Sequence, residues 1–121
     1  MQPREKTVVE KALDTFRKRT RIGADFLYEK TGTDLHGDGI VRLAHEGQQW
    51  DFKAEVKLRV NRATIALVKQ KMDRAGECLL VTGYVNPELA EVMKNQGIFF
   101  IDAAGNAFID ATQLYIFVKG E

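Results

Sequence analysis

The chain has 121 residues and a formal net charge of +1, with 45% hydrophobic and 29% charged residues. This length suits one domain spanning residues 1–121, and the composition excludes a disordered or fibrous protein. No apolar run reaches the roughly 18 residues of a membrane span, the start lacks a signal-peptide core, and there is a single cysteine, Cys78. We therefore expect a cytoplasmic protein without an internal disulfide or a membrane partner.

The first predicted element is an amphipathic helix from Glu5 to Phe16, because apolar residues recur along it at helical spacing. Glu5 falls near the centre of the apolar stripe, whereas Glu10 points toward solvent. A glutamate that faces the core needs a partner. Glu5 is therefore either a ligand of a metal site or a side chain that reaches water at the helix end.

A basic run ends this helix: Arg17, Lys18, Arg19 and Arg21. Cations at this end complement the negative pole of the helix dipole, which explains the run without any ligand. Because the net charge is small, a contact with nucleic acid has to come from a local patch. This run is the candidate patch for DNA.

Seven strands and two more helices follow in the sequence pattern. Asn61 and Asn86 are predicted N-caps of helices that end before Gly76 and at Gly97. The apolar run from Cys78 suits a central strand covered on both faces, which implies a βαβ crossover, and places Cys78 in the core. The predicted strands are Ala24–Tyr28, Gly39–His45, Gln48–Val60, Cys78–Val85, Ile98–Ile101, Ala107–Ile109 and Leu114–Val118.

Two of these strands form a hairpin around the turn Glu46-Gly47, in which glycine can adopt positive φ. Pairing outward from the turn sends the apolar side chains to one face and the charged ones to the other. Directly opposed carboxylates repel each other, so a cation or a proton is expected between Asp38 and Glu55. The predicted pairs are Leu43 with Trp50, Val41 with Phe52, Arg42 with Asp51, and Asp38 with Glu55.

The tripeptide Glu55-Val56-Lys57 is the candidate site. Asp38 and Glu55 can hold Mg²⁺, with Glu5 as a further ligand, while Lys57 polarises an attacking water or steadies a phosphate. The alternative is a polar, solvent-facing sheet surface in which Arg42 pairs with Asp51 and Lys57 neutralises its neighbours.

The roles of several other polar residues can also be interpreted in two ways. Lys69, Gln70 and Lys71 on the following helix either touch a phosphate backbone or are simply solvated. Asp102 and Asn106 are typical turn residues whose side chains bond local backbone, with a ligand role as the alternative. His36 and His45 lack the paired spacing of a zinc site.

The order helix, strand, hairpin with Asp38 and then Glu55-Val56-Lys57, helix, strand resembles the PD-(D/E)xK nucleases. This resemblance implies a restriction-endonuclease-like α/β fold: an α-β-β-β-α-β core with a mixed sheet, helices on its faces and extra carboxy-terminal strands. It also implies that Asp38 and Glu55 bind the metal and that Lys57 lies near the attacking water. The sequence departs from the pattern because no proline precedes Asp38, and the glutamate of the first helix maps to Glu5 or Glu10.

A narrower resemblance covers nearly the whole chain. The segments 83–91 and 97–107 and the closing Val118-Lys119-Gly120 look like the amino-terminal domain of AbiEi-type antitoxin regulators of type IV toxin–antitoxin systems. Members of that family usually continue into a winged-helix DNA-binding segment, so we expect either a piece of a longer protein or a stand-alone relative.

Three functions follow as hypotheses. The first is a nuclease-fold domain of an antitoxin-type regulator, linked to DNA defence or mobile elements and acting by DNA or partner binding, with a toxin as the implied partner. The second is a Mg²⁺-dependent DNA endonuclease that uses Asp38, Glu55 and Lys57. The third is a non-catalytic scaffold that forms a homodimer through an exposed sheet edge.

Overall fold

A mixed sheet organises the computed structural model, which describes residues 2–28, 39–75 and 77–121. Within these residues the sheet has seven strands, and their order in space is their order in the chain. The described residues form a single α/β domain, as expected. The strands are β1 (Gly23–Tyr28), β2 (Gly39–His45), β3 (Gln48–Lys57), β4 (Cys78–Thr82), β5 (Phe99–Asp102), β6 (Ala107–Ala111) and β7 (Leu114–Val118).

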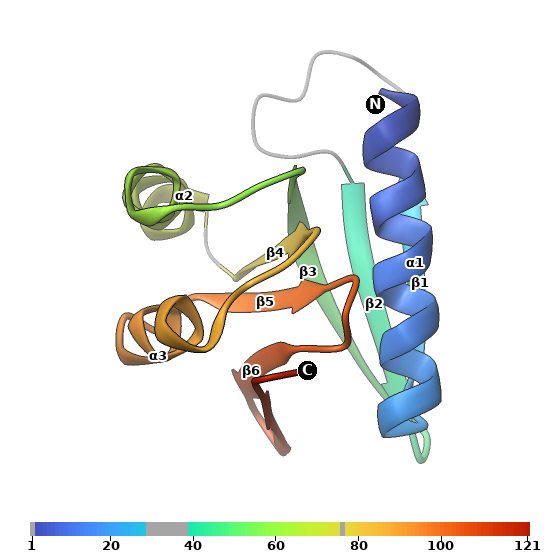
Figure 1. Ribbon diagram of the computed structural model, residues 1–121. Coiled ribbons are helices and arrows are strands. Elements are labelled where there is room, and N and C mark those ends of the chain that lie inside the picture. Colours follow the sequence, from blue (N-terminus) through green and yellow to red (C-terminus); the bar gives the residue numbers. More distant parts are fainter. Residues whose placement is uncertain (1, 29–38, 76) are drawn as a thin grey trace.

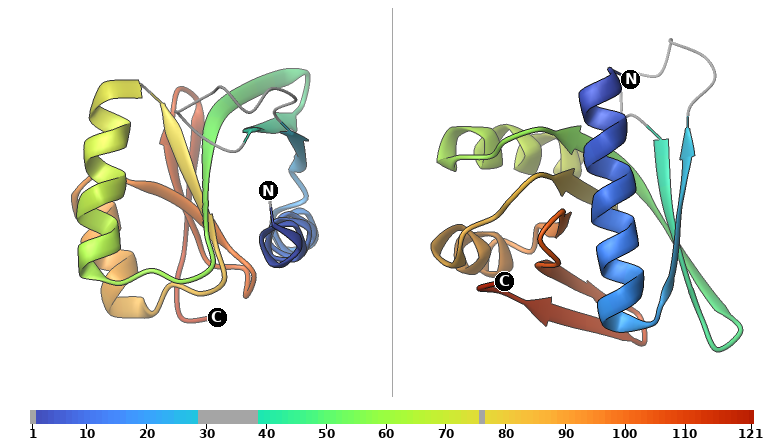
Figure 2. Two further views of the ribbon diagram at one scale, coloured as in Figure 1. Left: turned by 90° about the horizontal axis from the view of Figure 1, so that it is seen from above. Right: turned by 45° about the vertical axis from the view of Figure 1, so that its right-hand side comes forward.

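Helices cover both faces of this sheet. Helix α1 (Pro3–Thr20) lies on one face, and helices α2 (Arg62–Ala75) and α3 (Pro87–Asn95) lie together on the other (Figure 1). The view from above shows the same three layers, with the sheet between α1 and the pair α2 and α3 (Figure 2). Side chains that alternate along a central strand therefore enter two different cores.

Strand directions follow from the connections. Tight turns join β2 to β3 and β6 to β7, and these pairs are antiparallel, as are β1 with β2 and β5 with β6. Helix α2 connects β3 to β4 and helix α3 connects β4 to β5, and both of these pairs are parallel. The predicted βαβ crossover is confirmed, and the described residues open with the element order α-β-β-β-α-β.

Two hydrophobic clusters stabilise the layers. Leu79 and Val81 of β4 pack in the cluster beneath α1, whereas Leu80 packs in the cluster beneath α2 and α3. All three side chains have 0% exposure, so β4 is the central strand that its apolar sequence predicts. Cys78 opens this strand in the core, and burial raises the pKa of its thiol.

The hairpin register is confirmed where the structure describes it. Leu43 pairs with Trp50, Val41 with Phe52 and Arg42 with Asp51. The turn residues Glu46 and Gly47 have φ of 49° and 79°, as in the primed turns that suit the twist of a hairpin. The last described pair is Gly39 with Ala54, so the predicted pair of Asp38 and Glu55 lies outside the described residues.

Element boundaries differ from the prediction where the parallel strands end. Strand β3 ends at Lys57 rather than Val60, and Leu58, which was expected on the apolar face, is 37% exposed. The backbone carbonyl of Leu58 accepts a 3.3 Å hydrogen bond from the Gly83 N–H, just after β4 ends. The chain then turns into α2, where Asn61 Oδ1 accepts from the Thr64 N–H at 2.9 Å. Side-chain capping thus replaces strand pairing beyond Lys57.

Helix α1 is longer than predicted at both ends. It extends to Thr20, and Arg21 adopts φ of 62° as its C-cap, with its N–H donating to the Arg17 carbonyl at 2.9 Å. A left-handed residue is a common way to end a helix, and it satisfies one of the last free carbonyls. The basic run therefore forms the last turn of α1 and its cap.

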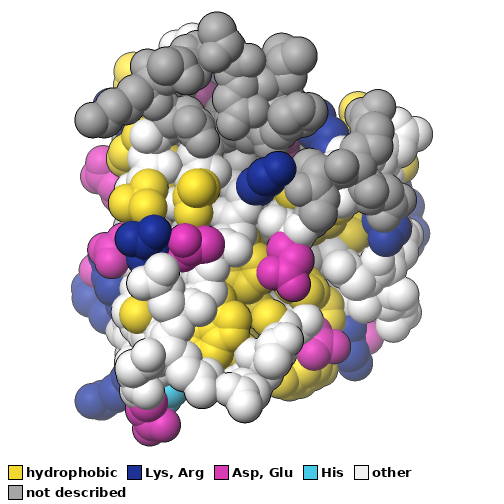
Figure 3. Space-filling model, turned by 180° about the vertical axis from the view of Figure 1, so that it is seen from behind, with side chains coloured by type: hydrophobic (Ala, Val, Ile, Leu, Met, Phe, Trp, Pro, Cys, Tyr) yellow, Lys and Arg dark blue, Asp and Glu magenta, His cyan; other side chains and the backbone are white. Residues whose placement is uncertain are grey.

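Charges of both signs are scattered over the face seen from behind, with apolar side chains exposed between them (Figure 3). Among the described helices, none has both the length and the apolar character needed to cross a membrane.

Candidate functional site

Glu55 lies on the side of the sheet that α2 covers. Strand β3 places Glu55 beside Leu80 and Lys57 beside Thr82 of β4, so Glu55 and Lys57 share one face. The Glu55 side chain is only 12% exposed, which is low for a carboxylate. A carboxylate removed from water to this extent requires a compensating charge.

Two lysines supply that charge. Lys71 of α2 donates a 2.8 Å hydrogen bond to Glu55 Oε1, and Lys57 Nζ lies 3.4 Å from the same oxygen. The side chains of Lys71 and Lys57 remain 44% and 40% exposed. A common anion thus holds both ammonium groups at the protein surface, and the three-residue cluster carries one net positive charge.

Lys71 is the member of this cluster that the sequence pattern left undecided between a phosphate contact and a solvated face. A signal was present, because Lys71 comes three residues after Val68, which is buried in the stripe of α2. Residues three apart are neighbours on a helix surface, so Lys71 borders the buried stripe and reaches over the sheet. The partner of Lys71 could not be read from that spacing.

A cavity of about 330 Å³ opens beside this cluster, between the end of β3 and α2. We call it the lysine cavity. Three cations line it, Lys57, Arg59 and Lys71, and its described lining holds no carboxylate. Its remaining lining residues are Leu58, Thr64, Leu67, Val68 and Gln70.

Among the described residues, the structure does not bring the expected metal ligands together. Within the described ranges, no group of three His, Cys, Asp or Glu side chains is placed to hold a metal ion. Asp38 lies outside those ranges. Glu5 is at the start of α1, where its Oε1 accepts a 2.9 Å hydrogen bond from the Gln2 N–H, the geometry of a helix cap. Of the three expected ligands, Glu55 alone is seen in the candidate site.

The basic run at the end of α1 is paired with carboxylates in the structure. Lys18 lies 2.9 Å and Arg17 3.8 Å from Asp14, and Arg19 contacts Glu121. Arg17 also donates to the backbone carbonyl of Ala24. In the described part of the chain, only Arg21 of the four has no ion pair. Less free positive charge is therefore available here than the sequence suggests.

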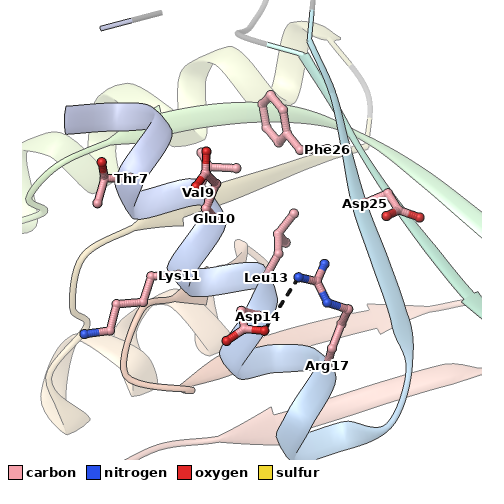
Figure 4. A pocket seen from close by; sticks show the side chains of 9 residues that line it. All are labelled: Thr7, Val9, Glu10, Lys11, Leu13, Asp14, Arg17, Asp25 and Phe26. Carbon is pink, nitrogen blue, oxygen red and sulfur yellow. Dashed lines mark ion pairs between the residues drawn. The ribbon is translucent and has the colours of Figure 1, made fainter. Parts of the chain in front are cut away.

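A larger cavity, about 620 Å³, lies between α1 and β1 (Figure 4). Leu13 and Phe26 contribute apolar walls, and Asp14 and Arg17 form an ion pair at 3.8 Å across one side. This cavity lies on the face of the sheet that α1 covers. It is therefore separated by the sheet from Glu55 and the lysine cavity.

Two further polar groups have structural roles: the Arg42–Asp51 pair, which was the alternative interpretation, and Asp102 with Asn106, for which a turn role was expected. Arg42 donates to both carboxylate oxygens of Asp51, at 3.0 and 3.1 Å, and this contact lowers the pKa of Asp51. Asp102 is fully buried, and its carboxylate accepts from the N–H groups of Ala104, Asn106 and Val85 and from the Asn106 side chain. Asp102 and Asn106 thus fix the β5–β6 turn, as their turn chemistry predicts.

Comparisons of the chain with protein-family models, with curated proteins and with solved structures found no match.

Proposed function

We propose that this chain is a nuclease-fold domain of an antitoxin-type regulator, linked to DNA defence or mobile elements, which binds a DNA phosphate backbone at the lysine cavity. A protein partner such as a toxin belongs to the same proposal, through the resemblance to AbiEi-type regulators.

The fold supports this proposal through its element order. The described residues begin with the order α-β-β-β-α-β, and β3 and β4, which α2 connects, are parallel. This is the order of the restriction-endonuclease-like core that the resemblance implies. Glu55 and Lys57 project from β3 on the same face, where that core carries its carboxylate and lysine.

The single observation that carries the proposal is the charge of the lysine cavity. Lys57, Arg59 and Lys71 come from two segments and converge on one concavity. Glu55 fixes two of these ammonium groups, so little side-chain entropy is lost when a phosphate binds them. Lys and Arg at a phosphate backbone supply most of the affinity in sequence-independent DNA binding.

The proposed DNA contact lies at the lysine cavity rather than at the basic run that ends α1. There, Asp14 and Glu121 already neutralise much of the basic run. At the lysine cavity, Arg59 has no ion pair within the described residues, and the two lysines share one carboxylate. Both sites keep an excess of positive charge, but only at the lysine cavity do the cations converge on one concavity.

A direct test compares two variants that each remove two positive charges. Lys57→Gln/Lys71→Gln alters the lysine cavity, and Lys18→Gln/Arg21→Gln alters the end of α1. Fluorescence anisotropy with labelled DNA at several NaCl concentrations gives the affinity and its salt slope. We expect the first variant to weaken binding about tenfold or more and to lower the slope by about 2, and the second to change both much less.

Circular dichroism and urea unfolding of both variants would show that each remains folded at the assay temperature. Absence of wild-type binding at about 0.1 M NaCl would overturn the proposal, since phosphate-dominated binding is strong at low salt. Equal losses in the two variants would remove the lysine cavity as the site.

A Mg²⁺-dependent endonuclease is the second candidate, favoured by the 3.4 Å contact of Glu55 and Lys57 on one face. Glu55, with Asp38, would hold the ion, because Mg²⁺ is commonly bound by one or two carboxylates, waters and substrate phosphates. A bound ion would supply a Lewis acid and an activated water. Lys71 would have to give up Glu55 Oε1, after which its ammonium group is free to contact a phosphate.

The endonuclease is tested with supercoiled, linear and branched DNA in the presence of Mg²⁺ or Mn²⁺. Cutting by the wild type, but not by Glu55→Ala/Lys57→Ala, would establish it. If no DNA form is cut and calorimetry detects no Mn²⁺ binding, catalysis is rejected while the binding proposal stands.

A homodimeric scaffold is the third candidate, and the edge strand β7 favours it. Tyr115 is 59% exposed, and the strand consists only of apolar and aromatic residues, Leu114–Val118. An exposed apolar edge strand can pair with a second copy. Light scattering over a range of concentrations would detect the dimer, and Tyr115→Lys, at the exposed residue of β7, should abolish it.

A further inference from the structure

A second cavity adjoins the lysine cavity. Its volume is about 400 Å³, and the two cavities share Leu58 and Arg59 as a common wall. We call it the tyrosine cavity, after Tyr84. Its other lining residues are Val60, Gly83, Asn86 and Leu89. A ligand that occupies one cavity and extends past Leu58 therefore enters the other.

The walls of the tyrosine cavity offer apolar surface to solvent. Tyr84 is 49% exposed and Leu58 is 37% exposed, and Leu67, across the lysine cavity, is 62% exposed. No carboxylate is among the described residues that line either cavity. The surface thus combines exposed apolar and aromatic groups with the three cations of the lysine cavity.

The backbone on both sides of Tyr84 is fixed. The Gly83 N–H donates to the Leu58 carbonyl at 3.3 Å, and the Val85 N–H donates to the buried carboxylate of Asp102 at 2.8 Å. A Cβ at position 83 would lie 2.9 Å from the Leu58 carbonyl oxygen, so glycine allows the two walls to approach. The Tyr84 ring is therefore presented from a rigid segment, which reduces the entropy lost when a ligand packs on it.

A ligand that suits both cavities must carry negative charge and a flat apolar group within a short distance. Nucleotides of an unpaired strand have both, because each phosphate is joined to an accessible base that can stack on an aromatic side chain. A duplex presents its phosphates but keeps its bases stacked inside, so it would use the cations and leave Tyr84 without a contact. An acidic amphipathic peptide would match the charge, but it does not require an exposed aromatic ring beside a cationic cavity.

We propose, on the basis of the function proposed above, that the two cavities together bind single-stranded DNA. Phosphates lie at Lys57, Arg59 and Lys71, and an unpaired base packs against Tyr84 and Leu58. The substrate class of the domain is then single-stranded or locally opened DNA rather than intact duplex.

The test uses fluorescence anisotropy with a labelled oligothymidylate of about twelve nucleotides and a duplex of the same length. Tyr84→Ala removes the ring, Tyr84→Phe keeps it, and Tyr115→Ala removes a more exposed tyrosine from β7 as a control. We expect the wild type to bind the single strand more tightly than the duplex. Tyr84→Ala should weaken single-strand binding about tenfold, while Tyr84→Phe and Tyr115→Ala should stay within about twofold of the wild type.

Duplex binding should be unchanged by Tyr84→Ala and weakened by Lys57→Gln/Lys71→Gln, which separates the base contact from the phosphate contacts. If the wild type binds duplex but has no preference for the single strand, this inference fails and the proposed function stands. If neither DNA form binds, both fail. Displacement of the oligothymidylate by a poly-glutamate peptide of equal charge, at equal concentration, would assign the surface to an acidic protein instead.

Discussion

Lys71 Nζ lies 2.8 Å from Oε1 of Glu55, the same oxygen that Lys57 approaches to 3.4 Å. Helix α2 thus adds the cation Lys71 to the motif Glu55-Val56-Lys57 of β3, which the sequence pattern indicates without reference to that helix. Glu55 is the least exposed of the three side chains, so its carboxylate determines where both ammonium groups are held.

This geometry predicts unequal coupling of the two lysines to Glu55. A double-mutant cycle with Glu55→Gln and Lys71→Met should give a coupling free energy of up to about 1 kcal/mol in urea unfolding. The matched cycle with Lys57→Met should give a smaller value, because its contact is longer. A larger coupling for Lys57 would mean that the hydrogen bond from Lys71 is not the main partner of Glu55.

The buried carboxylate of Asp102 should be essential to stability. The Asp102 carboxylate accepts hydrogen bonds from backbone N–H groups at 2.8 to 2.9 Å. In Asp102→Asn, an amide nitrogen, itself a donor, replaces one of the accepting oxygens. We expect the free energy of unfolding to fall by about 3 kcal/mol. Asp110→Asn, at an exposed position of β6, is the control and should change it by less than about 0.5 kcal/mol. Similar values for the two variants would contradict the role of Asp102.

The substitution Thr82→Val should stabilise the folded protein. The Thr82 side chain has 0% exposure, and within the described residues its hydroxyl has no hydrogen-bond partner. Thr82→Val keeps the shape and removes this unpaired group, so we expect thermal or urea unfolding to show a gain of about 1 kcal/mol. Thr15→Val is the matched control and should lose a similar amount, because the Thr15 hydroxyl donates to the Ala103 carbonyl at 3.2 Å. A loss of stability in Thr82→Val would refute the prediction.

The contact of Arg42 with Asp51 should add a small, pH-dependent increment to stability. The hydrogen bonds from Arg42 lower the pKa of Asp51 in the folded state. Such a group stabilises the fold above the ordinary carboxyl pKa of about 4, and the effect is lost as the pH falls through the lowered value. The stability difference between the wild type and Asp51→Asn, measured by urea unfolding, should therefore be present at pH 7 and vanish in acid. High salt at pH 7 should shrink it, since both side chains are partly exposed.

The β2–β3 turn should respond in opposite directions to two substitutions. Gly47 has φ of 79°, so Gly47→Ala should lower the free energy of unfolding by about 1 kcal/mol. Glu46 has φ of 49°, a region that asparagine tolerates better than glutamate, so Glu46→Asn should raise the stability. Both side-chain positions are exposed, so packing changes do not obscure the result in urea unfolding. Changes of the same sign would argue against a primed turn.

Local sequence patterns predicted the order of the elements and the register of the hairpin. Hydrophobic periodicity and turn residues act between near neighbours, so Glu46-Gly47 and the pair of Val41 and Phe52 were readable from the chain. The N-caps Asn61 and Asn86 and the buried strand β4 follow for the same reason. The placement of Glu55 and Lys57 on one face came from strand alternation alone.

Contacts between charged residues far apart in the chain depend on the tertiary packing. Glu55 and Lys71 are sixteen residues apart, and Arg19 and Glu121 are separated by nearly the whole chain. The crossover helix α2 and the approach of the carboxy-terminal Glu121 to α1 set these contacts, and periodicity carries no information about them. The same long-range packing ended β3 early, exposed Leu58 and brought Tyr84 beside it. Local patterns therefore identified the strand motif, and the packing of α2 against the sheet gave it a cationic cavity.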